Sequence, residues 1–220
     1  MKQDAIFLGH LGLGDHIICQ GIINHISPLY NKIELLAKHH NAQSVNYMCK
    51  NIDNVQVVGV ANDDEAIAIV NNSPSRKIKI GAFGDNWRYQ KFGFDKVFYE
   101  QVGLDMEQSF NWTTEYGRLG DTIVQDLYPK TDFCFVHDDS NRNFNINLNT
   151  KLPIVRNSIK SETIFDYLPL IKMAKEVHCM DSSFALMIDR SAINSKNIFI
   201  HRSLRVSSGV PTYKKNWNIV

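Results

Sequence analysis

The sequence predicts an α/β protein with mostly parallel sheets, because strand-like and helix-like stretches alternate along its 220 residues. Residues 5–8 form a short apolar run, and residues 55–60 are rich in β-branched side chains, as buried strands are. Between these runs, residues 15–27 have the length and apolar content of a helix. Such alternation indicates βαβ units, in which helices cover both faces of a parallel sheet.

The first half of the chain contains four expected strands and four expected helices. The strands are the apolar or alternating runs at 5–8, 33–37, 55–60 and 77–83. The helices are expected at 15–27, 40–51, 66–71 and 94–102. Acids at 63–65 precede the third helix, where the helix dipole favours negative charge, and Gly103 ends the fourth.

The second half repeats this style with shorter elements. Strands are expected at 132–137, 153–156, 176–180 and 197–201. Helices are expected at 182–190 and at 163–174, which Pro169 kinks or restarts. At 144–149, Ile and Leu alternate with Asn, which predicts an antiparallel partner or an edge strand. The tail from residue 206 is expected to be irregular.

Residues 104–130 show the weakest pattern and contain Gly117, Gly120 and Pro129. Glycine and proline interrupt regular structure, so we expect a hinge here between two Rossmann-like lobes. The expected division is an N-terminal lobe of residues 1–128 and a smaller C-terminal lobe of residues 129–220, which includes the tail.

The composition is that of a globular protein and excludes several classes. A formal net charge of +1 gives no support for binding nucleic acid, as acceptor or otherwise, or an anionic membrane. No apolar run approaches the roughly 18 residues of a membrane span. The N-terminus lacks a signal-peptide layout, and the four scattered cysteines have no C-x-x-C spacing. We therefore expect a cytoplasmic protein with reduced thiols and neither a zinc site nor a cofactor.

The glycine-rich loop GHLGLGD, residues 9–15, follows the first expected strand and precedes the first expected helix. Such a loop opens nucleotide-binding α/β units, because glycine lets the backbone approach an anion at a helix N-terminus. The dinucleotide fingerprint G-x-G-x-x-G lacks its third glycine here, and Asp15 would repel a pyrophosphate. No G-K-[ST] follows, which excludes a P-loop. An NAD-dependent oxidoreductase is thereby disfavoured.

Asp15 has two interpretations. It could be a helix N-cap, a position that aspartate fills well. It could also be a general base, because a carboxylate at the carboxyl edge of a parallel sheet faces the ligand crevice. His10 and His16 flank it; each is more often a surface or capping histidine than a catalyst, and His10, which lies in the turn itself, is the better candidate.

Three polar junctions follow expected strands in the second half. Residues 137–142 include Arg142, which either binds a diphosphate bidentately or pairs with Asp138 or Asp139. Residues 181–183 begin a helix and could form an anion site or an ordinary cap. Residues 201–205 add two cations. In the first half, Trp87 and Arg88 follow a strand, where a tryptophan stacks on sugars or anchors a loop.

The opening FLGHLGLGDHII, residues 7–18, resembles the first loop of GT-B glycosyltransferases of the heptosyltransferase type. In that family the aspartate of a G-D-x-(I/L) turn is the proposed general base. The segment DSSFALMID, residues 181–189, resembles the start of the donor-phosphate helix. Residues 98–105, 135–142 and 201–217 are similar to a group of short glycosyltransferase-like proteins. This chain is shorter than typical members, and DSSFA lacks the usual glycine and histidine.

The resemblance implies a compact GT-B-like enzyme with a cleft between its lobes. It would move a sugar from a nucleotide-sugar donor to a hydroxyl of a glycan or other acceptor, without metal and with inversion. Adjacent Asp138 and Asp139 could instead bind a divalent ion. The donor-phosphate residues implied are His137, Arg142, Asp181, Ser182, Ser183 and Arg205. The catalytic residue is Asp15, and the acceptor side is His10, Gly12, Gly14, Trp87 and Arg88.

Two alternatives remain beside this hypothesis. The first is a non-catalytic module that binds nucleotides or glycans and has kept the fold. The second is the NAD-dependent oxidoreductase. Neither the donor sugar nor the nucleotide base follows from the sequence, although Glu162, at an expected helix start, is a candidate to hold a nucleotide ribose.

Overall fold

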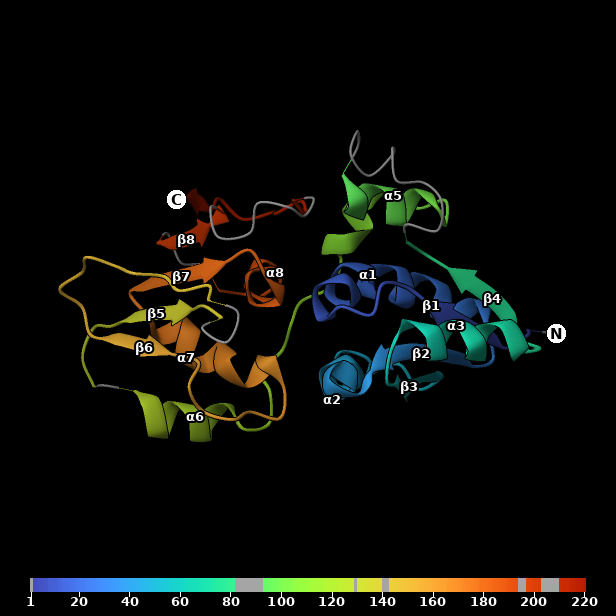
Figure 1. The fold of residues 1–220 in the computed structure, drawn as a ribbon, viewed down its shortest axis with the longest axis horizontal. Coiled ribbons are helices and arrows are strands. Elements are labelled where there is room, and N and C mark those ends of the chain that lie inside the picture. Colours follow the sequence, from blue (N-terminus) through green and yellow to red (C-terminus); the bar gives the residue numbers. More distant parts are fainter. Residues whose placement is uncertain (1, 82–92, 129, 140–142, 194–196, 203–209) are drawn as a thin grey trace. The chain divides into compact units, whose positions relative to one another are not determined.

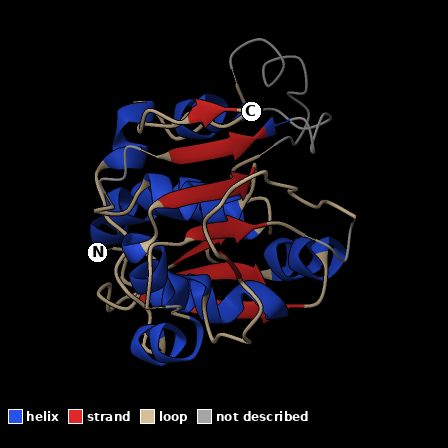
Figure 2. Ribbon diagram, turned by 90° about the vertical axis from the view of Figure 1, so that its left-hand side faces the viewer, coloured by secondary structure: helices blue, strands red, loops and turns tan. Residues whose placement is uncertain are grey.

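The computed structural model in Figure 1 describes residues 2–81, 93–128, 130–139, 143–193, 197–202 and 210–220. The chain forms two compact units. The first unit comprises Met1–Trp112 with Gly209–Thr212, and the second comprises Thr113–Ser208 with Tyr213–Val220. Each unit contains a parallel sheet with helices, so the protein is α/β as predicted (Figure 2).

The first unit is built on a four-stranded sheet with the order β3-β2-β1-β4. Its strands are β1 (Ala5–Leu8), β2 (Ile33–Lys38), β3 (Val55–Val60) and β4 (Arg76–Lys79). All three pairings are parallel, with Ala5 beside both Ile33 and Arg76. Because β1 lies between β2 and β4 and is completely buried, its apolar run needs no polar alternation.

Helices cover both faces of this sheet. They are α1 (Leu13–Ile26), α2 (His39–Met48), α3 (Asp63–Asn72) and α5 (Phe94–Glu100), with the 3-10 turns η1 (Ser27–Leu29) and η2 (Met106–Phe110). Ile6 and Leu8 pack with Val70 of α3 in one apolar cluster. On α1, the Ile18 carbonyl accepts a hydrogen bond of 2.7 Å from the Tyr99 hydroxyl of α5. α5 ends at Glu100 with Gln101 as its C-cap, two residues before the expected end, and Gly103 follows in the turn with a φ of 71°.

The second unit contains a five-stranded sheet with the order β6-β5-β7-β8-β9. Its strands are β5 (Cys134–His137), β6 (Ile154–Arg156), β7 (Glu176–Met180), β8 (Ile198–His201) and β9 (Asn218–Ile219), all paired in parallel. Its helical elements are α6 (Gly120–Leu127), η4 (Ile164–Tyr167), α7 (Leu168–Met173) and α8 (Ser183–Asp189). Pro169 lies in the first turn of α7, so it restarts the helix as expected.

The two faces of the second sheet are covered differently. On one face, Phe135 packs against Tyr167 of η4 and Phe184 of α8. On the other face, Cys134 and Val136 pack against Ile146, which belongs to the non-helical connection between β5 and β6. An extended crossover therefore replaces a helix on that face.

Several sequence-based expectations for local structure were wrong. Residues 144–149 form no strand; one antiparallel bridge joins Asp139 to Phe144, and the alternating apolar side chains pack onto the sheet instead. The tail is not wholly irregular, because β9 extends the sheet at its end. The weakly patterned region contains helix α6, which makes its contacts with η4 and α7 and belongs to the second unit.

Candidate functional site

The glycine-rich loop lies at the point of the first sheet where the strand order reverses. The chain proceeds from β1 to β2 and β3 on one side and then crosses back to β4 on the other. In open parallel sheets, ligands bind outside the carboxyl ends of the strands at such a switch point. The loop from Leu8 to Leu13 connects β1 to α1, and the Asn41 side chain holds it by donating a 2.9 Å hydrogen bond to the Leu11 carbonyl.

Asp15 is the third residue of α1, and it is half-buried. The N-cap interpretation of Asp15 was wrong, because Gly12 occupies that position with a φ of −72° and a ψ of 142°. A Cβ on Gly12 would lie only 2.5 Å from Oδ2 of Asp15, so the carboxylate folds back over the loop. There it interacts favourably with the helix dipole, and its charge adds to burial in raising the pKa of the Cys19 thiol.

The other acceptor-side residues have different environments. His10 is exposed and stacks on Phe98, with ring centroids 5.6 Å apart. His16 is buried, and burial lowers its pKa to about 4, so it is neutral near pH 7. Gly14 is the second residue of α1 and is half-buried. Trp87 and Arg88 lie outside the described residues.

The second sheet has its own switch point between β5 and β7, because the chain goes from β5 to β6 and then crosses back to β7. His137 ends β5, and Ser182 is the N-cap of α8 just after β7. The Ser182 hydroxyl oxygen lies 3.3 Å from Nδ1 of His137, and the His137 ring stacks on Phe184 at 3.9 Å. Two predicted donor-side residues that lie 45 positions apart in sequence are therefore neighbours.

The remaining donor-side residues differ in what surrounds them. Asp181 is buried and accepts a 2.6 Å hydrogen bond from the Tyr213 hydroxyl of the tail. Burial and this carboxylate both raise the pKa of Tyr213. Ser183 begins α8 and is half-buried. Arg142 and Arg205 lie outside the described residues.

Sequence reasoning missed Arg156 as the partner of Asp138. The Arg156 guanidinium forms an ion pair with the Asp138 carboxylate and donates to the Ile146 carbonyl. The same carboxylate oxygen, Oδ2 of Asp138, also accepts a hydrogen bond from the Ile146 amide, so this oxygen is engaged by the chain itself. The parallel register that pairs Val136 with Arg156 brings this arginine to the end of β5. No local sequence motif predicts that Arg156 lies beside Asp138.

Glu162, the candidate to hold a nucleotide ribose, and Glu34, an acid of the second strand, both have structural partners. Glu162 forms an ion pair with Arg118. Glu34 is the second residue of β2 and pairs with Lys32 at 2.8 Å. A dinucleotide fold holds the ribose with an acid at the end of its second strand. The position of Glu34 therefore does not favour a dinucleotide cofactor.

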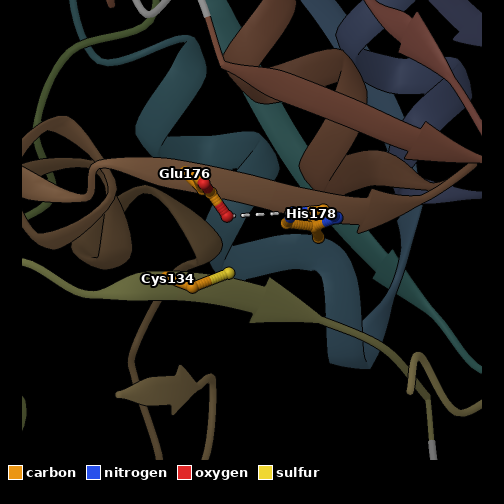
Figure 3. A group of neighbouring side chains, drawn as sticks. All are labelled: Cys134, Glu176 and His178. Atoms are coloured by element: carbon orange, nitrogen blue, oxygen red, sulfur yellow. Dashed lines mark ion pairs between the residues drawn. The ribbon is translucent and has the colours of Figure 1, made fainter. Parts of the chain in front are cut away.

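One group of side chains among the described residues could hold a metal ion: Cys134, Glu176 and His178. Their ligand atoms all lie within 4.8 Å of one another (Figure 3). The group lies toward the amino ends of β5 and β7, whereas His137 and Ser182 lie at the carboxyl ends. It is therefore separate from the donor-side residues.

The two parallel sheets, each with polar residues at its switch point, define the two-unit α/β fold found in GT-B glycosyltransferases. Two solved structures share this fold: the iron-containing dodecameric glycosyltransferase TibC from enterotoxigenic E. coli H10407 and a glycosyl transferase family 9 protein from Veillonella parvula DSM 2008. Each superposes with a TM-score of 0.52, 10% sequence identity and coverage of 91% of this chain. The sequence matches no protein-family model and no curated protein.

The matched chains are longer than this one. The superposition spans 58% of the TibC chain and 80% of the Veillonella protein. At 10% identity, the likeness establishes the fold that the resemblance of the opening loop implied. Among the described residues, there is no helix with the length and apolar character needed to cross a bilayer.

Proposed function

We propose that the protein is a glycosyltransferase that moves a sugar from a nucleotide-sugar donor to an acceptor hydroxyl. The observation that carries this proposal is the pairing of His137 with Ser182 at the switch point of the second sheet. Hydroxyl groups and a helix start at the carboxyl edge of a parallel sheet suit a phosphate-bearing ligand. The fold shared with two glycosyltransferases makes a nucleotide sugar the class of ligand to test.

In the proposed reaction, Asp15 removes the proton from the acceptor hydroxyl. The acceptor oxygen then attacks the anomeric carbon, and the bond from that carbon to the nucleoside diphosphate breaks with inversion. The leaving diphosphate takes the electron pair of the broken bond. Ser182, Ser183 and the arginines Arg142 and Arg205 stabilise its charge in place of a metal. The first unit would serve the acceptor and the second the donor.

Asp15→Asn tests the base directly, because the amide keeps the size of the carboxylate but accepts no proton. We expect transfer to fall about 10²- to 10⁴-fold while donor binding is retained. Asp64→Asn is the matched control, since it neutralises another acid in the first turn of a helix, α3, of the same unit. Transfer by Asp15→Asn at the wild-type rate would refute the base assignment.

The donor is identified by thermal unfolding with UDP-, GDP-, CMP- and ADP-sugars. A ligand that binds the folded state at 100 times its Kd adds about 2.7 kcal/mol of apparent stability. Ser182→Ala should remove most of the stabilisation by the productive donor. Ser75→Ala, in the first unit, should leave it unchanged. If no member of the panel raises the melting temperature, a nucleotide-sugar donor is excluded.

A non-catalytic module that binds nucleotides or glycans is the second candidate. The observation in its favour is that the segment DSSFA, residues 181–185, lacks the glycine and the histidine that are usual in the family it resembles. Such a module would be stabilised by a nucleotide sugar but would release no nucleoside diphosphate with any acceptor. Measurement of nucleoside diphosphate release, with and without glycan acceptors, separates the two functions.

A further inference from the structure

Cys134, Glu176 and His178 lie on one face of the second sheet, on two hydrogen-bonded strands. Cys134 of β5 is the register partner of Glu176 of β7, so their side chains leave the sheet on the same side. His178 is two residues beyond Glu176 and faces the same way. Figure 3 shows the thiol of β5 and the two side chains of β7 converging on a common space.

The three side chains offer a mixed set of sulfur, oxygen and nitrogen ligands. Their ligand atoms lie within 4.8 Å of one another, and a Glu176 carboxylate oxygen is 3.8 Å from Nε2 of His178. A tetrahedral Zn²⁺ takes such ligands at about 2.0–2.3 Å, which places neighbouring ligand atoms about 3.3–3.8 Å apart. Metal binding would therefore draw the three side chains closer together.

His201 provides a second, independent observation. Its Nε2 lies 2.9 Å from Nδ1 of His178, on the side of the ring opposite to Glu176. A proton on Nδ1 of His178, donated to His201, leaves Nε2 with its lone pair directed at the group. Metal-bound histidines are oriented by such a partner.

The surroundings permit a cation to enter and to remain. The Glu176 side chain is 32% exposed, which provides access from solvent. Cys134 is fully buried, and its thiol would lose its proton on binding a metal ion. A bound cation would displace that proton to solvent. The positive charge of Arg156 would repel a metal ion bound nearby. This charge is neutralised by the ion pair that Arg156 forms with Asp138.

We propose that Cys134, Glu176 and His178 bind a Zn²⁺ ion, with His201 as a positioning residue for His178. Water completes the fourth ligand position. The ion would join β5 to β7 on the face that an extended crossover covers. Cys134 and Glu176 begin their strands, at the opposite end from Ser182, so the ion itself is separate from the proposed site of glycosyl transfer.

The test begins with full-length protein stripped by a chelator and then dialysed against ZnCl₂. We expect about one equivalent of zinc per chain by elemental analysis, with loss of retained zinc in Cys134→Ser. Cys179→Ser is the matched control, because this buried thiol lies on β7 but leaves the sheet on the opposite face. Retention of less zinc than protein by the wild type, or equal retention by Cys134→Ser, would overturn the site.

Cobalt provides a readout of the ligand set itself. Co²⁺-loaded wild type should show a thiolate-to-cobalt charge-transfer band and tetrahedral visible bands, both kept in Cys179→Ser. If Cys134→Ser does not fold, Glu176→Gln, at a partly exposed position, takes its place and should bind Co²⁺ at least about 10-fold more weakly. An octahedral, sulfur-free spectrum in the wild type would reject the proposed ligands.

The positioning role of His201 has its own variant. His201→Phe should weaken Zn²⁺ binding about 10- to 100-fold while the thiolate-to-cobalt band persists at saturation. Unchanged affinity would show that His201 does not orient His178. Loss of the band together with a changed fold by circular dichroism would assign His201 a purely structural role.

Discussion

Gly12 leaves room for the Asp15 carboxylate in the glycine-rich loop. The carboxylate occupies the space into which a side chain at position 12 would extend. Glycine is therefore favoured here by the close approach of the Asp15 carboxylate and not by the backbone, since its φ of −72° is open to any residue. The orientation of the Asp15 carboxylate, the proposed base, therefore depends on the absence of a Cβ at position 12.

Gly12→Ala should displace Asp15 and lower kcat, with a smaller effect on the melting temperature. The new methyl group would lie 2.5 Å from Oδ2, which the flexible carboxylate relieves by turning away. Gly9→Ala is the control, because its methyl group would meet its nearest atom at 3.4 Å, an ordinary contact. Transfer assays and thermal unfolding of both variants check this. Equal kcat in the two variants would contradict it.

His16 should make the stability of the first unit depend on pH. Its pKa of about 4 lies below the unfolded value of 6.5, so the unfolded chain binds more protons between these values. Stability is therefore highest above pH 6.5 and falls as the pH decreases. From about pH 7 to about pH 5 the loss from this group is roughly 2 kcal/mol. Urea unfolding at both values should show a smaller loss in His16→Gln, and an unchanged loss in exposed His10→Gln.

At the scale of elements, the tail is held by a buried carboxylate. Asp189, at the end of α8, accepts from the backbone amides of Lys214 and Lys215 and from the Trp217 indole. Its side chain and that of Arg190, which pairs with it at 3.2 Å, are both 0% exposed. These bonds fix the chain just before β9, so a two-residue strand persists at the sheet edge.

Asp189→Asn should cost about 3 kcal/mol of stability, because it leaves the buried Arg190 charge uncompensated. It should also increase hydrogen exchange at 214–220. Asp132→Asn is the control: it removes an ion pair with Lys175 in which Asp132 is 69% exposed, and should cost under about 1 kcal/mol. Chemical denaturation and exchange mass spectrometry measure both effects. A similar cost for the two variants would contradict the role of burial.

The sequence predicted elements best where a short run has strong strand propensity. The runs 55–60 and 176–180 are strands with the expected bounds, although only Val60 of the first run is buried and the second includes Glu176 and His178. β9 was not predictable, since Asn218 and Ile219 become a strand only through pairing with β8. Helix α6 was obscured by the glycines and proline around it. The alternation at 144–149 arises from packing on a sheet and has the same period as a strand.

The candidate sites show a similar division. Both switch-point loops were predictable, because polar residues directly follow apolar strands. The arginine beside Asp138 and the group around Cys134 were not, because their members come from different strands and meet only through the parallel register. The spacing of residues along the sequence does not predict such pairings. The exception is the two-residue interval between Glu176 and His178, which predicts that they share one face of a strand.

At the scale of the whole molecule, the two sheets repeat one plan. Each has a first strand flanked on both sides and a loop at the resulting switch point. Because both sheets have such a switch point, the topology alone does not determine which unit binds the nucleotide. The proposal assigns it to the second unit, where Ser182 and His137 meet.

A nucleoside diphosphate should therefore protect the second unit from hydrogen exchange. With UDP, GDP, CDP and ADP as probes, we expect slower exchange near 137 and 181–184 and no change at 9–15. The corresponding nucleosides, which lack phosphate, are the control and should give little protection. Protection confined to 9–15 would assign the nucleotide to the first unit and favour a dinucleotide-binding function.

The chain path through the tail constrains the order of folding. The short segment that ends at Thr212 returns to the first unit, where the Asp95 carboxylate accepts a hydrogen bond from the Thr212 amide. Proteins are made from the N-terminus, and early domains usually fold before later ones emerge from the ribosome. The first unit here is completed only after nearly all of the second has been synthesised. Asp95, which is 1% exposed in the folded protein, must lack this partner throughout translation of the intervening chain.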